Sequence, residues 1–229
     1  MRYAVYFAPP PSSPLHKLGS EWLGRDAWTG EPVAQPALQD LADMTDSPRR
    51  YGFHATLKPP FALAEGIAGD LILETVEKLA ETQAGFAITL RVGVIDGFLA
   101  LVPDRPPPEL QHLADRCVME LDGLRRPPPD DELARRRKSA LTPRQDQHLL
   151  RWGYPYVLED FRFHMTLSER LEPDALERLK LAASSHFAPA LSRPVPIDGL
   201  TVFTEASPGA AFHAVRHVPF RLPAMESGA

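Results

Sequence analysis

A short phrase that occurs twice constrains the fold of this chain more than any other feature. Residues 53–57 (FHATL) and 163–167 (FHMTL) both read apolar-His-apolar-Thr-Leu, and the histidines at positions 54 and 164 give an offset of 110. Because a strand points successive side chains to opposite faces, each copy buries its apolar residues and presents His and Thr together. The repeat therefore predicts a duplicated scaffold in which two imidazoles and two hydroxyls converge on one cleft.

The order of elements around the two copies also repeats. The first copy is followed by a helix capped by Asp70 and by strands at 86–95 and 98–102, which Asp96-Gly97 joins. The second is followed by a helix from Pro173 and by strands at 195–203 and 212–218. Ile-Asp-Gly occurs at 95–97 and 197–199, an offset of 102, so the repeat is diverged. A strand at 3–7 and a helix over 14–23 precede the first copy.

Prolines suggest where the two parts of the chain meet. The 25 prolines cluster at 9–11, 106–108 and 127–129, where they end elements and stiffen loops. We expect one bilobal domain over 1–229, with lobes at about 1–105 and 106–229 and with the option that strands are exchanged between them. Extra helices are predicted at 109–121 and at 142–153, the second opened by a Thr142–Gln145 capping box.

Charge and composition narrow the class of partner. The net charge is −5, whereas a protein that grips long nucleic acid is usually basic, so a small phosphorylated substrate is favoured. The single Cys117 excludes an intramolecular disulfide and a multi-cysteine zinc site. Without a bilayer-length apolar stretch or a signal-peptide pattern, we expect a cytoplasmic protein that does not bind a membrane. The sequence does not determine the oligomeric state.

The residue types of the repeated motif suit proton transfer around a phosphate. Imidazole has an unperturbed pKa of about 6.5, so near neutral pH one copy can be neutral and the other protonated. Cleavage of a phosphodiester needs a base for the attacking oxygen and an acid for the departing one. We assign these roles to His54 and His164, in an order left open, and phosphate binding to Thr56 and Thr166. No metal or cofactor is required.

Weaker candidates for phosphate or substrate contacts surround the motif. Lys58 lies on the same predicted face as His54, and Ser168 is its equivalent in the second copy. Arg50 and Arg162 flank the two histidines, while Tyr3 and Tyr6 either line the cleft or simply pack. The basic run 135–138 most simply forms a solvated helix face, although it could guide an anionic substrate. A metal site formed by His54 and His164 with His16 or His213 is disfavoured, because no His-x-His pair is present.

The paired motifs and their flanks resemble the two-histidine (2H) phosphoesterase superfamily, which includes RNA 2′,3′-cyclic phosphodiesterases and RNA ligase-like proteins. Residues 50–61, 152–156 and 161–167 are similar to one uncharacterised branch, which is linked to phosphonate metabolism. The resemblance covers about residues 2–222. It implies a duplicated, two-lobed α+β fold with two antiparallel sheets flanking a central cleft and helices packed outside. It also implies the same four motif residues as the site.

These observations predict an enzyme, a metal-independent hydrolase of a cyclic phosphate or a small phosphodiester. The substrate expected from the resembling branch is a cyclic ribosyl phosphate or a nucleotide. One alternative is an RNA 2′,3′-cyclic phosphodiesterase or ligase-like enzyme. Another is a non-catalytic module that binds a nucleotide or sugar phosphate with the same side chains.

Overall fold

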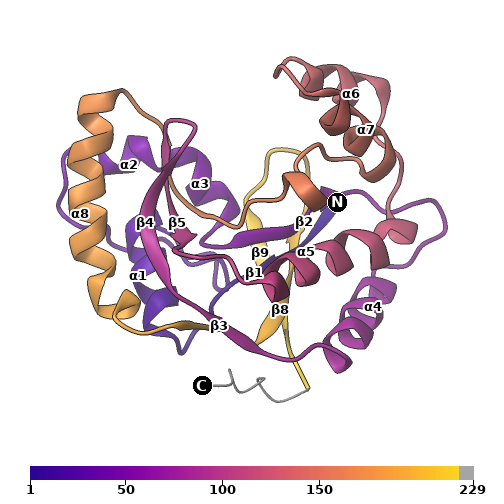
Figure 1. The fold of residues 1–229 in the computed structure, drawn as a ribbon, viewed down its shortest axis with the longest axis horizontal. Helices are drawn as coiled ribbons and strands as arrows, with labels where there is room; N and C mark the ends of the chain where they lie inside the picture. Colours follow the sequence, from indigo (N-terminus) through magenta and orange to yellow (C-terminus); the bar gives the residue numbers. More distant parts are fainter. Residues whose placement is uncertain (222–229) are drawn as a thin grey trace.

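The structure is a computed structural model that describes residues 1–221. Its centre is a seven-stranded sheet in which every pair of neighbouring strands is antiparallel, with the order β4-β5-β6-β2-β1-β8-β9 (Figure 1). The strands are β1 (Arg2–Phe7), β2 (Ala55–Phe61), β4 (Leu90–Ile95), β5 (Phe98–Pro103), β6 (Met165–Arg170), β8 (Gly199–Glu205) and β9 (Phe212–Pro219). A second, two-stranded sheet pairs β3 (Phe86–Ile88) with β7 (Val195–Ile197).

Helices surround this sheet. They are α1 (Pro14–Leu23), α2 (Leu41–Met44), α3 (Asp46–Tyr51), α4 (Asp70–Glu81), α5 (Pro108–Glu120), α6 (Asp130–Arg137), α7 (Pro143–Trp152) and α8 (Pro173–Leu191). In Figure 1, α1, α2, α3 and α8 lie on the left and α4 and α5 on the right, while α6 and α7 project at the upper right. None of the helices in the described part of the chain is both long and apolar enough to cross a bilayer.

Local sequence signals explain where several helices begin and end. The Ser13 hydroxyl accepts a hydrogen bond from the Leu15 amide at the start of α1, and Gly24 ends this helix with a φ of +79°. Thr142 and Gln145 form the predicted capping box of α7, and Gly153 ends that helix in the left-handed region. The structure thus confirms the predicted helix at 14–23 and the capped helix that ends at Gly153.

The duplicated order of elements is confirmed, with one refinement. The order β2-α4-β3-β4-β5 is repeated as β6-α8-β7-β8-β9. The segments 86–95 and 195–203, each predicted as one strand, are both divided after three residues. The first three residues of each segment form the small sheet, and the rest of each joins the large one.

The α+β class is confirmed, and the two expected antiparallel sheets are the two halves of one large sheet. The halves are β4-β5-β6 and β2-β1-β8-β9, and they meet between β2 and β6, where the only registered pair is Ala55 opposite Met165. Each half draws strands from both parts of the chain, because β5 pairs with β6 and β1 pairs with β8.

The two faces of the sheet have different surroundings. One face carries the main core, to which Val5, Ala55, Leu57 and Met165 contribute and on which α1, α4, α5 and α8 pack. The opposite face holds a small apolar cluster around Tyr6, Phe203 and Phe212. Since Tyr6 pairs with Thr56 in the β1–β2 register, the motif threonine shares this second face. The polar residues of the motif therefore lie opposite the main core.

Candidate active site

Both copies of the motif show the predicted alternation of burial. Phe53, Ala55 and Leu57 are buried, as are their equivalents Phe163, Met165 and Leu167. His54, Thr56, His164 and Thr166 are only partly buried. Each histidine lies directly before the first residue of its strand, β2 or β6.

The seam between β2 and β6 brings the two copies together. Since Ala55 lies opposite Met165 in an antiparallel pair, the same register places His54 opposite Thr166 and Thr56 opposite His164. Residues opposite each other on one face have Cβ atoms roughly 4.5–5.5 Å apart, and diagonal neighbours are roughly 7–8 Å apart. The two histidines occupy one diagonal of this four-residue set, and the two threonines occupy the other. This arrangement suits a single phosphate held between them.

Each imidazole is oriented by the backbone carbonyl two residues before it. The Nδ1 atom of His54 is 2.9 Å from the Gly52 carbonyl oxygen, and that of His164 is 2.7 Å from the Arg162 carbonyl oxygen. A carbonyl oxygen can only accept, so Nδ1 carries the hydrogen in both rings. In the neutral state the Nε2 atom of each ring is consequently the proton acceptor.

The surroundings of the two rings differ. The His54 ring stacks on Tyr6, with centroids 3.8 Å apart and planes at 24°, and its Nε2 accepts from the Thr56 hydroxyl at 3.2 Å. The His164 ring lies beside Phe98, with centroids 5.7 Å apart and planes at 57°. The His54 ring is thus held in place by its stacking on Tyr6 and by the hydrogen bond between its Nε2 and Thr56.

Burial shifts the acid–base equilibrium of both histidines toward the neutral form. It lowers the pKa of His54 to about 4, and the nearby charge of His164 adds to this effect, while the Gly52 carbonyl opposes it. Burial also lowers the pKa of His164, against the hydrogen bond to the Arg162 carbonyl and the negative charge of Asp96. Both shifts favour the neutral ring near pH 7.

A cavity of about 1060 Å³ opens over this face of the sheet. His54, Thr56 and Thr166 line it, and His164 packs against Phe98, which also lines it. Five arginines reach the same cavity; they are Arg2, Arg50, Arg135, Arg136 and Arg170. Three of the four motif residues therefore line one hollow, and His164 lies behind Phe98 rather than in the lining itself. The five arginines share the wall with the carboxylates of Asp131, Glu132 and Glu169.

Two of the weaker candidates, Arg50 and Tyr6, line the cavity, and Tyr6 is also packed in the small apolar cluster. The Arg50 guanidinium is stacked over the Tyr51 ring at 4.6 Å and lies 3.6 Å from a carboxylate oxygen of Glu205. The other oxygen of the buried Glu205 accepts from Arg2 at 2.5 Å. One carboxylate thus orients two guanidinium groups that face the cavity.

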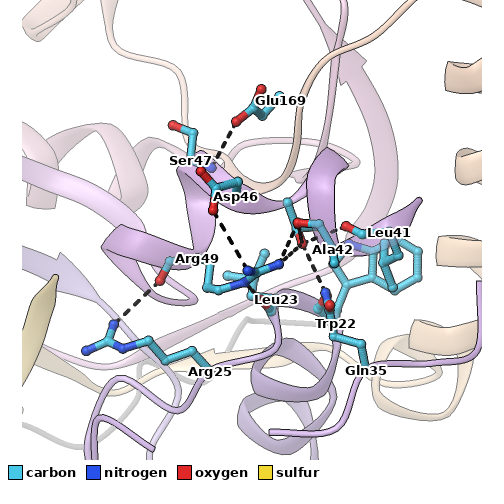
Figure 2. Close-up of polar contacts among 11 residues, drawn as sticks. Trp22, Leu23, Arg25, Gln35, Leu41, Ala42, Asp46, Ser47, Arg49 and Glu169 are labelled. Atoms are coloured by element: carbon cyan, nitrogen blue, oxygen red, sulfur yellow. Dashed lines mark hydrogen bonds and ion pairs between the residues drawn. The ribbon is translucent and has the colours of Figure 1, made fainter. Parts of the chain in front are cut away.

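Helix α3 carries Arg50, and its neighbour Arg49 fixes the helix to the protein (Figure 2). The Arg49 side chain donates to the Leu23 carbonyl at 2.8 Å and to the Ala42 carbonyl at 2.5 Å. At the start of α3, the Ser47 amide donates to Glu169, which follows the second motif, at 3.0 Å. Arg49 therefore holds in place the helix from which Arg50 and Tyr51 reach the cavity.

Lys58 does not share the face of His54, and this prediction is wrong. The β1–β2 register shifts between the pairs Tyr6–Thr56 and Val5–Lys58, so a bulge at Leu57 turns Lys58 toward the main core. Its buried ammonium donates to the Val118 carbonyl at 2.8 Å and to Asp122 at 3.3 Å. Burial lowers the pKa of Lys58 to about 8, an effect that Asp122 opposes. Lys58 joins β2 to the end of α5 and does not line the cavity.

Three other predicted contacts are also placed differently. Ser168 borders the cavity, but its hydroxyl is engaged, accepting from the Leu99 amide at 2.9 Å and donating to the Glu169 carbonyl at 2.7 Å. Tyr3 packs at the edge of the main core beside Gly69, away from the cavity lining. Arg162 contributes its backbone carbonyl to His164, and its side chain is not part of the cavity wall.

Several cavity residues were missed by sequence reasoning. Arg2 reaches the site because β1 lies beside β2, and Arg170 does so because a register shift in the β5–β6 pair places it opposite Phe98. Tyr51 and Tyr154 form aromatic parts of the wall. Within residues 1–221, no group of three or more His, Cys, Asp or Glu side chains is arranged to hold a metal ion.

Two curated relatives, from Janthinobacterium sp. (strain Marseille) and Laribacter hongkongensis (strain HLHK9), are both named ribose 1,5-bisphosphate phosphokinase PhnN. The first is 42% identical over 229 residues, covering 96% of this chain and 51% of that protein. The second is 42% identical over 220 residues, covering 95% of this chain and 52% of that protein. The chain thus spans about half the length of the curated relatives it matches.

Among solved structures, the chain is similar to LigT of E. coli, which is matched in two complexes. The complex with 3′-AMP has 16% identity and a TM-score of 0.41, with 96% of this chain and 97% of that chain covered. The complex with NADP+ has 14% identity and a TM-score of 0.43, with 96% of both chains covered. Likeness at this level describes the fold alone.

One family profile matches most of the chain. Its description is "Protein of unknown function (DUF1045)", and the match covers residues 56–213, which include Thr56, His164 and Thr166. His54 lies two residues before the matched segment. This chain therefore belongs to the DUF1045 family.

Proposed function

We propose that this chain is a phosphoesterase that opens a cyclic phosphate or a small phosphodiester by two-histidine acid–base catalysis. The observation that carries the proposal is the register at Ala55 and Met165, which sets both histidines and both threonines on one face of the sheet. The shared use of Nδ1 to bind a carbonyl supports it further, because it leaves Nε2 of each ring for proton transfer. For His54 this requires that the Thr56 hydroxyl, 3.2 Å from its Nε2, turns to donate to the phosphate instead.

The proposed step is a direct attack of water on phosphorus. The Nε2 atom of one neutral histidine takes a proton from water as the oxygen bonds to phosphorus. The bond from phosphorus to the leaving oxygen breaks, and the other histidine, protonated at Nε2, donates its proton to that oxygen. Hydrogen bonds from Thr56 and Thr166 stabilise the charge on the non-bridging oxygens. The product is a phosphate monoester, and no group beyond the four side chains and water enters the balance.

The relatives' name supports a sugar phosphate as substrate. They are named for a kinase of ribose 1,5-bisphosphate, and this chain corresponds to about half of each. The chain has no Gly-x-x-x-x-Gly-Lys-Ser/Thr sequence, which many kinases use to bind the phosphates of ATP, so we do not assign the kinase reaction to it. We propose instead a cyclic ribosyl phosphate as the substrate, in accord with the resemblance to a branch linked to phosphonate metabolism.

The proposal is tested with a panel of substrates after exhaustive chelation of metals. The panel contains ribose 1,2-cyclic phosphate, nucleoside 2′,3′-cyclic phosphates and an oligoribonucleotide with a 2′,3′-cyclic end. We expect turnover of the ribosyl or nucleoside compounds by wild type, and loss of turnover in His54→Ala and His164→Ala. His112→Ala, on α5 outside the cavity lining, is the matched control and should be active.

The same panel separates the alternatives. Turnover confined to the oligoribonucleotide would favour an RNA-end enzyme. Binding of the cyclic phosphates without turnover by wild type would contradict the catalytic proposal and favour a binding module. Loss of activity on chelation, with recovery on adding a divalent metal, would contradict the metal-independent mechanism.

A further inference from the structure

Helix α6 is unusual because it has no apolar face. Its sequence is Asp-Asp-Glu-Leu-Ala-Arg-Arg-Arg, and none of its side chains is buried. A surface helix is ordinarily held by a stripe of apolar residues that packs on the core. Core packing therefore does not explain why α6 lies where it does, next to the cavity.

Polar contacts to the following segment fix α6 instead. Arg137 makes a two-pronged ion pair with Asp146 of α7, with N–O distances of 2.6 and 3.1 Å. The Arg136 guanidinium lies over the Tyr154 ring at 4.9 Å and donates to Glu132 at 2.8 Å. The prolines at 127–129 stiffen the connection that leads into the helix. These contacts hold α6 and α7 as the projecting arm seen in Figure 1.

The arm presents two arginines to the cavity, together with two carboxylates. Arg135 and Arg136 both line it, and both share the single carboxylate of Glu132, at 3.6 and 2.8 Å. Arg2 and Arg50 share Glu205 in the same way. Asp131 lines the same wall as Arg135 and Arg136, and Glu169 lies elsewhere in the lining, so five arginines meet the three carboxylates of Asp131, Glu132 and Glu169. A bound anion would supply the missing charge, and guanidinium groups suit phosphate oxygens well.

The cavity is also larger than the proposed reaction needs. A volume of about 1060 Å³ is just above the roughly 300–1,000 Å³ typical of small-molecule sites. The four motif residues can hold only one phosphate. Space thus remains beside Arg135 and Arg136, at the wall that α6 supplies.

We infer that α6 forms a second anion subsite, in which Arg135 and Arg136 bind a phosphoryl group that is not the one undergoing reaction. The inference rests on the proposed function and specifies its substrate class. That class is a small sugar or nucleoside that bears a cyclic phosphate at the histidines and a separate phosphate monoester. Arg136 is positioned in advance by Tyr154 and Glu132, while Arg135, with 66% of its side chain exposed, has freedom to close on the ligand.

The test uses two substrates that differ by one phosphate, ribose 1,2-cyclic phosphate with and without a 5-phosphate. The proteins are wild type, Arg135→Gln, Arg136→Gln and the double variant. Lys138→Gln, which removes a positive charge just after the same helix and outside the cavity lining, is the control. We expect wild type to prefer the 5-phosphorylated substrate in kcat/KM. The double variant should lose about tenfold or more on that substrate, mainly through KM, and little on the other.

Separate readouts distinguish failure of this inference from failure of the proposed function. Turnover of both substrates with the same preference in wild type and double variant would overturn the inference and leave the function intact. If wild type turns over neither, the function fails, and binding of ribose 5-phosphate by calorimetry decides the inference. Weaker binding to the double variant than to wild type and Lys138→Gln supports the subsite, and equal binding to all three overturns it.

Discussion

The two copies of the motif share a backbone design but differ in their surroundings. In both, a carbonyl two residues earlier binds Nδ1, and a register shift follows the threonine. His54, however, is stacked on Tyr6, and its burial, together with the charge of His164, makes it harder to protonate. His164 lies near Asp96, whose negative charge favours the protonated form. The two copies therefore provide two similar imidazoles, and their different neighbours make one harder to protonate than the other.

This difference in protonation predicts which histidine is the base and which is the acid, a choice that the motif alone does not specify. The histidine that is harder to protonate suits the base, and the one near a carboxylate suits the acid. We therefore expect His54 to activate water and His164 to protonate the leaving oxygen.

The largest effect is expected when the two histidine variants are compared on substrates with different leaving groups. With an alkoxide leaving group, His54→Ala and His164→Ala should each lose roughly 10²–10⁴-fold in kcat, because each lacks one proton-transfer group. A p-nitrophenyl ester has a leaving group that needs no proton, so His164→Ala should recover most of its activity while His54→Ala stays inactive. Steady-state kinetics with matched esters measure this. Recovery in His54→Ala instead would exchange the two roles.

The dependence on pH gives the next largest effect. The value of kcat/KM reports ionisations of the free enzyme, and catalysis needs one histidine neutral and the other protonated. Burial lowers both histidine pKa values, that of His54 to about 4, so the optimum should lie below pH 6.5. Above it, kcat/KM should fall up to tenfold per pH unit as His164 loses its proton. A plateau from pH 6.5 to 8.5 would contradict the idea that burial sets these ionisations.

Gly52 and Arg162 supply the carbonyl groups that bind the two histidines, and substituting each of them gives a third comparison of the two copies. Gly52 has a φ of +80° and a ψ of 174°, and a Cβ there would lie 2.5 Å from the Cβ of Ala27. Gly52→Ala should destabilise the fold by about 1–3 kcal/mol, because this backbone region is almost confined to glycine. Arg162→Ala, at the equivalent place, should change stability by less than about 0.5 kcal/mol. Urea unfolding measures both, and equal effects would show that the two copies do not differ in backbone strain.

The smallest expected effect concerns Ser168, which lies two residues after Thr166. Ser168→Ala leaves the buried Leu99 amide without its acceptor and should cost about 1 kcal/mol of stability. Its kcat should change little, because the hydroxyl is already bonded to the protein. Ser184→Ala, on the exposed side of α8, is the control for thermal unfolding. A large fall in kcat with unchanged stability would show that Ser168 contacts the substrate after all.

Local pattern allowed much of this molecule to be predicted from its sequence. The alternation in each motif correctly gave the burial of Phe53, Phe163 and their neighbours, and the turn and capping residues gave several element ends. The placement of Lys58 failed because a bulge depends on the register between β1 and β2, which no single segment encodes. The unequal neighbours of His54 and His164 come from β1 and from the β4–β5 turn, and these contacts are likewise long-range.

The cavity wall was hardest to foresee for the same reason. In the sequence, the basic run 135–138 is typical of a solvated helix face, because it contains no apolar residue. Only the three-dimensional position of α6 shows that two of these arginines border the site and that a third, Arg137, holds the helix to α7.

The pairing of β1 with β8 has a consequence for how this protein is made. Tyr3 of β1 lies opposite Thr204 of β8, so some 200 residues separate two neighbouring strands. During synthesis β1 stays without this partner until β8 has also left the ribosome. The sheet can therefore close only after translation of β8, and closure of so long a loop is slow. A nascent chain arrested before residue 199 should expose an open strand edge, which makes it a natural client for chaperones.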